Sequence, residues 1–204
     1  RNVKLENPKR WDYRAPNLYV LKSALSESGK IADSLDTRFG FRTIEPKDGA
    51  FFLNGRRTKF FGAMYWLICT QSVSPNMKAE QKAIAEKDMV SSGINLARQN
   101  FPGQDFLLDI ADEIGLPVYL QYMSFTPDIN NKKTLDANIM CLREWTRLVY
   151  NHPSVIMMSL TNEDWDHVSG LDLQYKAGKE LAGGNILVCP SAGLYSWGGN
   201  LPPC

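Results

Sequence analysis

The fold class is indicated by residues 106–121, which read FLLDIADEIGLPVYLQ. Apolar side chains at positions 106, 107, 110, 111 and 114 form the one-sided stripe of an amphipathic helix. Gly115 is a residue type that ends helices, and the apolar run at 117–121 has the character of a buried strand. The segment therefore predicts a helix followed by a strand, as in proteins that repeat β-α units around a parallel sheet.

The same alternation continues on both sides of this segment. Further strands are predicted at 59–65, 94–98, 154–160 and 185–189, and further helices at 74–89, 134–150 and 171–181. This gives about five strands and four helices, whereas a closed (β/α)8 barrel of typically ~250 residues has eight of each. We therefore expect residues 46–204 to be the first half of a (β/α)8 TIM barrel.

Residues 1–45 have a different pattern, without a helical period. Two alternating runs, at 19–25 and 31–41, predict strands that are joined by a turn at Ser28 and Gly29. Two strands do not form a stable sheet alone. We expect this segment to be either an edge decoration or the tail of a β-domain whose beginning lies outside the chain.

The composition excludes several classes of function. Twenty-three Lys and Arg balance 22 Asp and Glu, so there is no electrostatic case for binding nucleic acid or an anionic membrane. No apolar stretch approaches the roughly 20 residues of a membrane span, and no glycine-rich phosphate loop is present. The four cysteines and two histidines lack metal-site spacing, so we expect free thiols, no metal and no cofactor. Cytoplasm, periplasm and extracellular space all remain open.

Candidate site residues are the polar groups that end otherwise apolar strands, because working groups of parallel α/β proteins gather there. They are Arg98, Gln99, Asn100, Gln121, Asn162, Glu163 and Ser191. A partly desolvated carboxyl group at Glu163 can act as a general acid near neutral pH. The alternative is that Glu163 only begins a solvated loop, and Arg98 pairs with a neighbouring acid. For His152, beside Pro153, a structural hydrogen bond to the backbone is the favoured role.

Several aromatic residues also fall at or just past strand ends. They are Tyr65, Trp66, Tyr122, Phe125, Tyr195 and Trp197. Their flat faces could stack on sugar rings, and packing in the core explains them almost as well.

Several motifs, in one collinear order, resemble glycoside hydrolase family 2, the group of β-galactosidases, β-glucuronidases and β-mannosidases. The sequence NHPSVI at 151–156 running into SLTNE at 159–163 resembles the acid/base signature of that family. RFGFR at 38–42 looks like the end of its immunoglobulin-like sandwich, and FLNG at 52–55 like the entry to its barrel. The resemblance covers roughly residues 11–165. Met158 and Thr161 stand where the family usually has Trp and Gly.

The resemblance implies a retaining β-glycosidase in which Glu163 is the general acid/base. It implies that Asn162 contacts the 2-hydroxyl of the sugar and that Arg98 is a subsite residue near the nucleophile. With these we group Tyr65, Trp66, Gln121 and Trp197 as substrate-binding residues. Residues 1–45 would be the C-terminal strands of the immunoglobulin-like β-sandwich.

Retaining hydrolysis needs a second carboxylate, about 5 Å from the first, to attack the anomeric carbon. The family takes it from a later barrel strand, which this chain does not contain. We therefore expect the chain alone to be inactive or nearly so, and to need the remainder of the barrel or a second copy of itself as partner.

Two other interpretations remain open. The chain could be a non-catalytic carbohydrate-binding or assembly module derived from such an enzyme. It could also be a complete five-stranded α/β fold of unrelated function, for which the analogy to a glycosidase would mislead.

Overall fold

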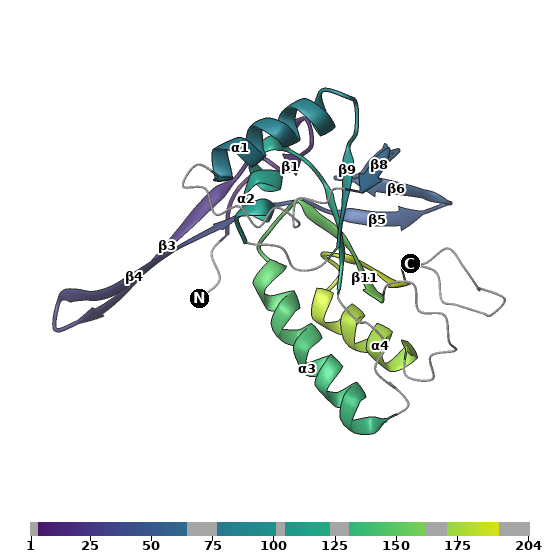
Figure 1. Cartoon of the computed structure of the whole chain (residues 1–204). Coiled ribbons are helices and arrows are strands. Elements are labelled where there is room, and N and C mark those ends of the chain that lie inside the picture. The colour runs from purple at the N-terminus through teal and green to yellow at the C-terminus, as the bar shows by residue number, and fades with distance from the viewer. Residues whose placement is uncertain (1–3, 65–76, 101–104, 123–130, 162–170, 192–204) are drawn as a thin grey trace.

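The computed structural model describes residues 4–64, 77–100, 105–122, 131–161 and 171–191, and these ranges form one five-stranded parallel sheet with attached β-structure (Figure 1). The sheet order is β8-β9-β10-β11-β12, so each strand lies beside its neighbours in the sequence. The bounds are Gly62–Met64 for β8, Leu96–Asn100 for β9, Val118–Gln121 for β10, Val155–Thr161 for β11 and Leu187–Ser191 for β12. The prediction of an α/β protein with a parallel sheet is confirmed.

Helical segments connect successive strands of this sheet. They are α1 (Met77–Ile84), which continues as the π-helical segment η2 (Ala85–Val90), then α2 (Asp105–Ile114), α3 (Lys132–Val149) and α4 (Leu171–Ala182). The predicted helix at 134–150 begins two residues early because Asn131 caps it, accepting a hydrogen bond from the Lys133 amide at 3.0 Å. None of the helices in the described ranges is both long and apolar enough to span a membrane.

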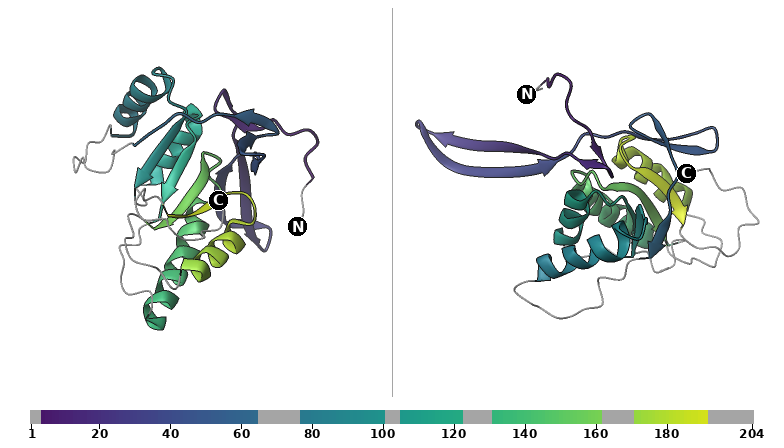
Figure 2. Two further views of the ribbon diagram at one scale, coloured as in Figure 1. Left: turned by 90° about the vertical axis from the view of Figure 1, so that its right-hand side faces the viewer. Right: turned by 90° about the horizontal axis from the view of Figure 1, so that it is seen from above.

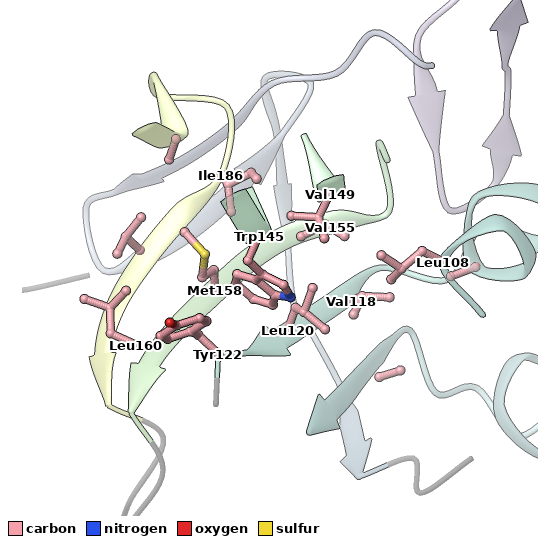
Figure 3. Packing of buried hydrophobic residues seen from close by; sticks show 14 of the residues in the cluster. Leu108, Val118, Leu120, Tyr122, Trp145, Val149, Val155, Met158, Leu160 and Ile186 are labelled. Atoms are coloured by element: carbon pink, nitrogen blue, oxygen red, sulfur yellow. The ribbon is translucent and has the colours of Figure 1, made fainter. Parts of the chain in front are cut away.

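The main hydrophobic core lies between the sheet and these helices (Figure 3). Strand residues two apart face the same way, so Val118 and Leu120 point to the helices together with Met158 and Leu160 of the next strand. From the helices come buried residues that include Leu108, Leu142, Trp145 and Val149. Because η2, α2, α3 and α4 all contribute to this one cluster, the helical segments cover the same face of the sheet.

Ahead of the parallel sheet lies a small antiparallel sheet that the sequence analysis missed. Its strands are β5 (Ile44–Lys47), β6 (Ala50–Leu53) and β7 (Arg56–Thr58). They are joined by Asp48-Gly49 and Asn54-Gly55, and all four of these turn residues have positive φ. Such dipeptides favour two-residue hairpin turns, so they were the signal in the sequence that could have predicted this sheet. Ile44 and Leu53 are buried in a second cluster with Met157 and Leu187, so this sheet packs on the face away from the helices.

The first part of the described chain forms short paired strands and a long ribbon. β1 (Trp11–Asp12) pairs with β2 (Ala15–Pro16), and β3 (Tyr19–Glu27) pairs with β4 (Lys30–Phe39). The β3-β4 ribbon extends well away from the parallel sheet (Figures 1 and 2). The turn at Ser28 and Gly29 was predicted, and both residues have positive φ.

Gly115 ends α2 in a place that allows no side chain. Its φ is +72°, and a Cβ atom there would lie 2.8 Å from the carbonyl oxygen of Tyr13. Gly93 ends the η2 segment with a similar φ of +79°, but a Cβ atom there would meet nothing within 4 Å. Both glycines therefore adopt the left-handed backbone that favours glycine, but only at Gly115 would a side chain also clash with a neighbour.

We expect Gly115→Ala to lower the free energy of unfolding by about 2–4 kcal/mol, because the left-handed backbone and the clash both add strain. Gly93→Ala should cost about 1 kcal/mol, the conformational part alone. Urea unfolding of the two variants measures the difference. Equal losses would show that the Tyr13 backbone moves away without cost.

Candidate active site

The candidate site lies on the face of the parallel sheet that points away from the helices, here called the inner face. Cross-strand register places Tyr119 beside Arg98 on one side and Met157 on the other, and Gln121 beside Ser159. In paired parallel strands, side chains of registered residues point the same way. The inner face is thus apolar toward the amino ends of the strands and becomes polar toward their carboxyl ends.

Arg98 and Gln121 are brought together by the fold, as two of the predicted site residues. The Arg98 Nη2 group donates a hydrogen bond to Gln121 Oε1 across the β9-β10 pair. Gln121 is registered with Asn100, two residues beyond Arg98, so the Arg98 side chain leans toward the carboxyl end of the sheet. The partner of Arg98 in this bond is an amide.

Ser159 is a polar residue of this face that the sequence analysis did not single out. It is fully buried, lies beside Gln121 in the register, and its main-chain oxygen accepts a hydrogen bond from the Tyr122 amide at 2.8 Å. Within the described part of the chain, neither its Oγ nor the Gln121 Nε2 atom has a hydrogen-bond partner, although both are buried. The signal that could have found Ser159 is its even spacing from Glu163 along the same strand direction.

Of the other predicted site residues, Gln99 is registered with Leu120 and so lies on the helix side, while Asn100 and Ser191 are the last residues of β9 and β12. Five more of the predicted acid/base and substrate-binding residues lie outside the described residues. These are Tyr65, Trp66, Asn162, Glu163 and Trp197. The structure carries the strand that leads to Asn162 and Glu163 as far as Thr161, the last residue of β11. Glu163 is therefore the second residue after the end of a strand in which Val155–Leu160 are all buried.

Tyr122, at the end of β10, proves to be a core residue. It is 7% exposed, and its ring packs against Trp145 with the two centroids 5.2 Å apart (Figure 3). Its hydroxyl donates a hydrogen bond to the Asn138 carbonyl at 3.2 Å, and burial raises the pKa of this phenol to about 12. Of the two roles considered for this residue, packing is the one observed.

A second group of titratable residues lies at the opposite end of the sheet. Asp112 is buried and accepts hydrogen bonds from the Ser154 amide at 3.0 Å and from His152 Nδ1 at 2.7 Å. Nearby, Arg38 forms ion pairs with Asp109 and with Glu113, the latter at 2.9 Å. Burial opposes the charge of Arg38, but these carboxylates outweigh it and raise its pKa.

Ligand atoms of Asp109, Asp112 and His152 lie within 4.8 Å of one another, a spacing that could hold a metal ion. Each of these residues already has a hydrogen-bond or ion-pair partner, and the Arg38 guanidinium already offsets the charge of Asp109. We interpret this cluster as structural. His152 is structural too, although its side chain bonds to a carboxylate and not to backbone.

Fold and site together define an α/β protein whose polar groups gather at the carboxyl ends of parallel strands, the place where such proteins bind ligands. Sequence comparison narrows the class. The family model described as glycosyl hydrolases family 2 matches residues 1–42. A putative β-glucuronidase of Formosa agariphila is 38% identical over 168 residues, which cover 80% of this chain and 20% of that protein. A β-galactosidase of Thermoanaerobacterium thermosulfurigenes is 31% identical over 172 residues, covering 79% of this chain and 23% of that protein.

Solved structures agree with the sequence comparison. A family 2 β-galacturonidase of Eisenbergiella tayi, bound to galacturonate, superimposes with a TM-score of 0.74 and 25% identity over 88% of this chain and 33% of that chain. The β-glucuronidase of Parabacteroides merdae has the same fold over 90% of this chain and 25% of its own, with a TM-score of 0.73 and 23% identity. The chain belongs to glycosyl hydrolases family 2. It spans about a fifth of the length of the curated relatives described here.

Proposed function

We propose that this chain carries the acid/base half of a retaining β-glycosidase site, with Glu163 as the general acid/base. The observation that carries the proposal is the inner face, on which Arg98, Gln121 and Ser159 gather toward the strand ends while β11 leads to Asn162 and Glu163. Membership of family 2 supports the reaction class, since the curated relatives are named as β-glucuronidases and β-galactosidases. The substrate is then a carbohydrate with a β-glycosidic bond.

The strand order supports a half barrel over residues 46–204. Barrels place each strand beside the next one in sequence, with the helices outside, and the sheet of this chain has both properties. Among the described residues, β8 and β12 each have a strand on one side only. Further strands, from the remainder of the barrel or from a second copy of the chain, would close it.

The ribbon supports the assignment of residues 1–45 to the end of an immunoglobulin-like sandwich. The side chains of Leu21, Leu25, Ile31 and Leu35 alternate onto one face of it, and each is at least half exposed. Large apolar side chains on one face of a sheet are what a β-sandwich buries against its second sheet.

The role of Glu163 follows from strand alternation and from the chemistry of a carboxyl group at a buried strand end. If the alternation of β11 continues, Glu163 faces the same way as Ser159 and so toward the Arg98 side. A carboxyl group that is partly desolvated there keeps its proton near neutral pH and can donate it to the leaving oxygen. Asn162 is proposed to contact the 2-hydroxyl, with Tyr65, Trp66 and Trp197 beside the sugar.

The second carboxylate is proposed to come from outside these 204 residues. Among the described residues, the acids Asp109, Asp112 and Glu113 are held by partners at the amino end of the sheet. A nucleophile must stand about 5 Å from the acid/base, at the carboxyl end.

The first test is hydrolysis of nitrophenyl β-galactoside, β-glucuronide, β-mannoside and β-glucoside by the 204-residue chain and its Glu163→Gln variant. We expect no turnover by either. Turnover by the chain that is lost in Glu163→Gln would mean that the chain or its self-assembly supplies the nucleophile, which contradicts the incomplete site. Sugar binding that is unchanged in Glu163→Gln and never accompanied by hydrolysis would favour a binding module.

The second test uses the assembled enzyme, with the remaining polypeptide supplied. There Glu163→Gln should lower kcat about 10²–10⁴-fold on substrates with poor leaving groups. On dinitrophenyl glycosides the loss of glycosylation rate should be small, because that leaving group departs without a proton. Asp164→Asn is the control and should change neither rate. Equal losses on both substrate types would contradict the acid role.

A further inference from the structure

Gln121 occupies a buried position, where a polar side chain without hydrogen-bond partners lowers the stability of the fold. The residue is fully buried in β10, the central strand, with β9 on one side and β11 on the other. Among the residues that the structure describes, its Nε2 group has no acceptor, and the neighbouring Ser159 Oγ has no hydrogen-bond partner. A buried donor without an acceptor destabilises a fold, and an apolar side chain of similar volume would avoid that cost. Folding alone therefore gives no reason for an amide here.

The one observed bond of this amide explains its presence. An arginine side chain has donors only, so the atom of Gln121 that meets Arg98 Nη2 must be the carbonyl oxygen Oε1. This fixes the amide orientation and turns Nε2 away from Arg98. Gln121 is registered with Asn100, two residues after Arg98, so the bond directs the Arg98 side chain toward the carboxyl end of the sheet. The proposed sugar-binding site lies at that end.

We propose that Gln121 is a positioning residue, whose carbonyl oxygen holds the Arg98 guanidinium at the carboxyl end of the sheet. Gln121 acts on the site through Arg98 and adds no negative charge of its own. A carboxylate in its place would hold the guanidinium equally well but would offset its charge. The inference rests on the proposed function in one respect, which is that Arg98 is taken as a residue of the sugar-binding site.

The test follows the side-chain ¹⁵N resonances of Arg98, assigned with Arg98→Lys, in the full chain. In the unsubstituted protein we expect slow rotation of the guanidinium group compared with the exposed Arg10. Gln121→Leu should speed that rotation about tenfold or more, because a charge-assisted hydrogen bond is lost. Gln121→Glu, which retains the acceptor, should restore slow rotation.

Stability provides the readout that separates positioning from a purely structural role. In an Arg98→Met background, which has no guanidinium to be left without its acceptor, Gln121→Leu should leave the urea midpoint unchanged or raised, since it then removes an unpaired buried donor and breaks no bond. The matched control is Gln99→Leu, a buried glutamine on the next strand with its Nε2 also unpaired but on the helix side of the sheet. It should leave the Arg98 rotation unchanged.

Three results would overturn the proposal. One is fast rotation of Arg98 in the unsubstituted protein, and another is slow rotation that persists in Gln121→Leu. The third is a urea midpoint that Gln121→Leu lowers in the Arg98→Met background as well, since the amide would then serve the fold without Arg98. None of these measurements requires a sugar, so a failure of the hydrolysis experiments would not affect them, and their failure would leave the role of Glu163 untouched.

Discussion

Replacing Arg42 by methionine should lower the free energy of unfolding by about 2–4 kcal/mol, because it leaves several main-chain carbonyl groups without donors. The Arg42 guanidinium donates hydrogen bonds to the carbonyl oxygens of Pro153, at 2.8 Å, and of Val155 and Asn185. These carbonyls lie at the amino ends of β11 and β12. One side chain from the link between β4 and β5 thus joins two strands of the parallel sheet.

The loss of unfolding free energy expected for Arg42→Met does not depend on pH near neutrality. Although part of the side chain reaches the surface, the guanidinium is enclosed by main chain, and this burial lowers the pKa of Arg42 to about 10. A lowered pKa of that size still leaves the group protonated in both folded and unfolded chains at pH 6 and pH 8. The difference between variant and unsubstituted protein should therefore be the same at both values.

Urea unfolding followed by far-ultraviolet circular dichroism measures this effect. The control is Arg147→Met, which removes an exposed arginine paired with Glu144 one turn away in α3. Exposed pairs of this kind contribute no more than about 0.5 kcal/mol. A loss for Arg42→Met as small as that of the control would show that water replaces the guanidinium at the strand ends.

Trp11→Ala should have the largest effect on stability, about 3–5 kcal/mol, as is typical for removal of a buried tryptophan. Trp11 is fully buried and forms hydrogen bonds with two distant parts of the fold. Its indole Nε1 donates a hydrogen bond to the Asp112 carbonyl at 2.8 Å, in the last turn of α2. Its main-chain oxygen accepts one from Asn54 Nδ2 at 2.9 Å, in the β6-β7 turn.

The variant Trp11→Phe separates packing from hydrogen bonding. Phenylalanine keeps most of the apolar contact but leaves the Asp112 carbonyl unsatisfied, which should cost about 1–3 kcal/mol. The same denaturation experiment measures both variants. Equal losses for Trp11→Phe and Trp11→Ala would mean that the hydrogen bond to Asp112, and not the packing of the ring, provides the stability. No loss for Trp11→Phe would mean that the Asp112 carbonyl has found another donor.

Much of the sheet could be predicted because its information is local. The alternation of apolar runs with helical stripes predicted all five parallel strands and the four helices between them, usually to within a few residues. The small β5-β6-β7 sheet was missed although Asp48-Gly49 and Asn54-Gly55 indicated its turns. Its strands are short, and Arg56 and Arg57 make the last one resemble a polar loop.

The candidate site was predictable only in part, because only some of its information is local in the sequence. A polar residue at the end of an apolar run is visible in the sequence, as Arg98, Gln121 and Glu163 were. Which of them meet is decided by the register between strands. The bond of Arg98 to Gln121 joins residues 23 positions apart, and Ser159 joins them only because β11 lies next to β10.

The sequence by itself determined that this is a parallel α/β protein of family 2 type, because hydrophobic period and short motifs are properties of neighbouring residues. The tertiary structure alone decided how the N-terminal segment is fastened to the sheet. Arg42 reaches carbonyl groups 111 to 143 residues away, and Trp11 reaches one 101 residues away. No local pattern encodes such partners, since they depend on which main-chain groups the packed sheet leaves in need of a donor.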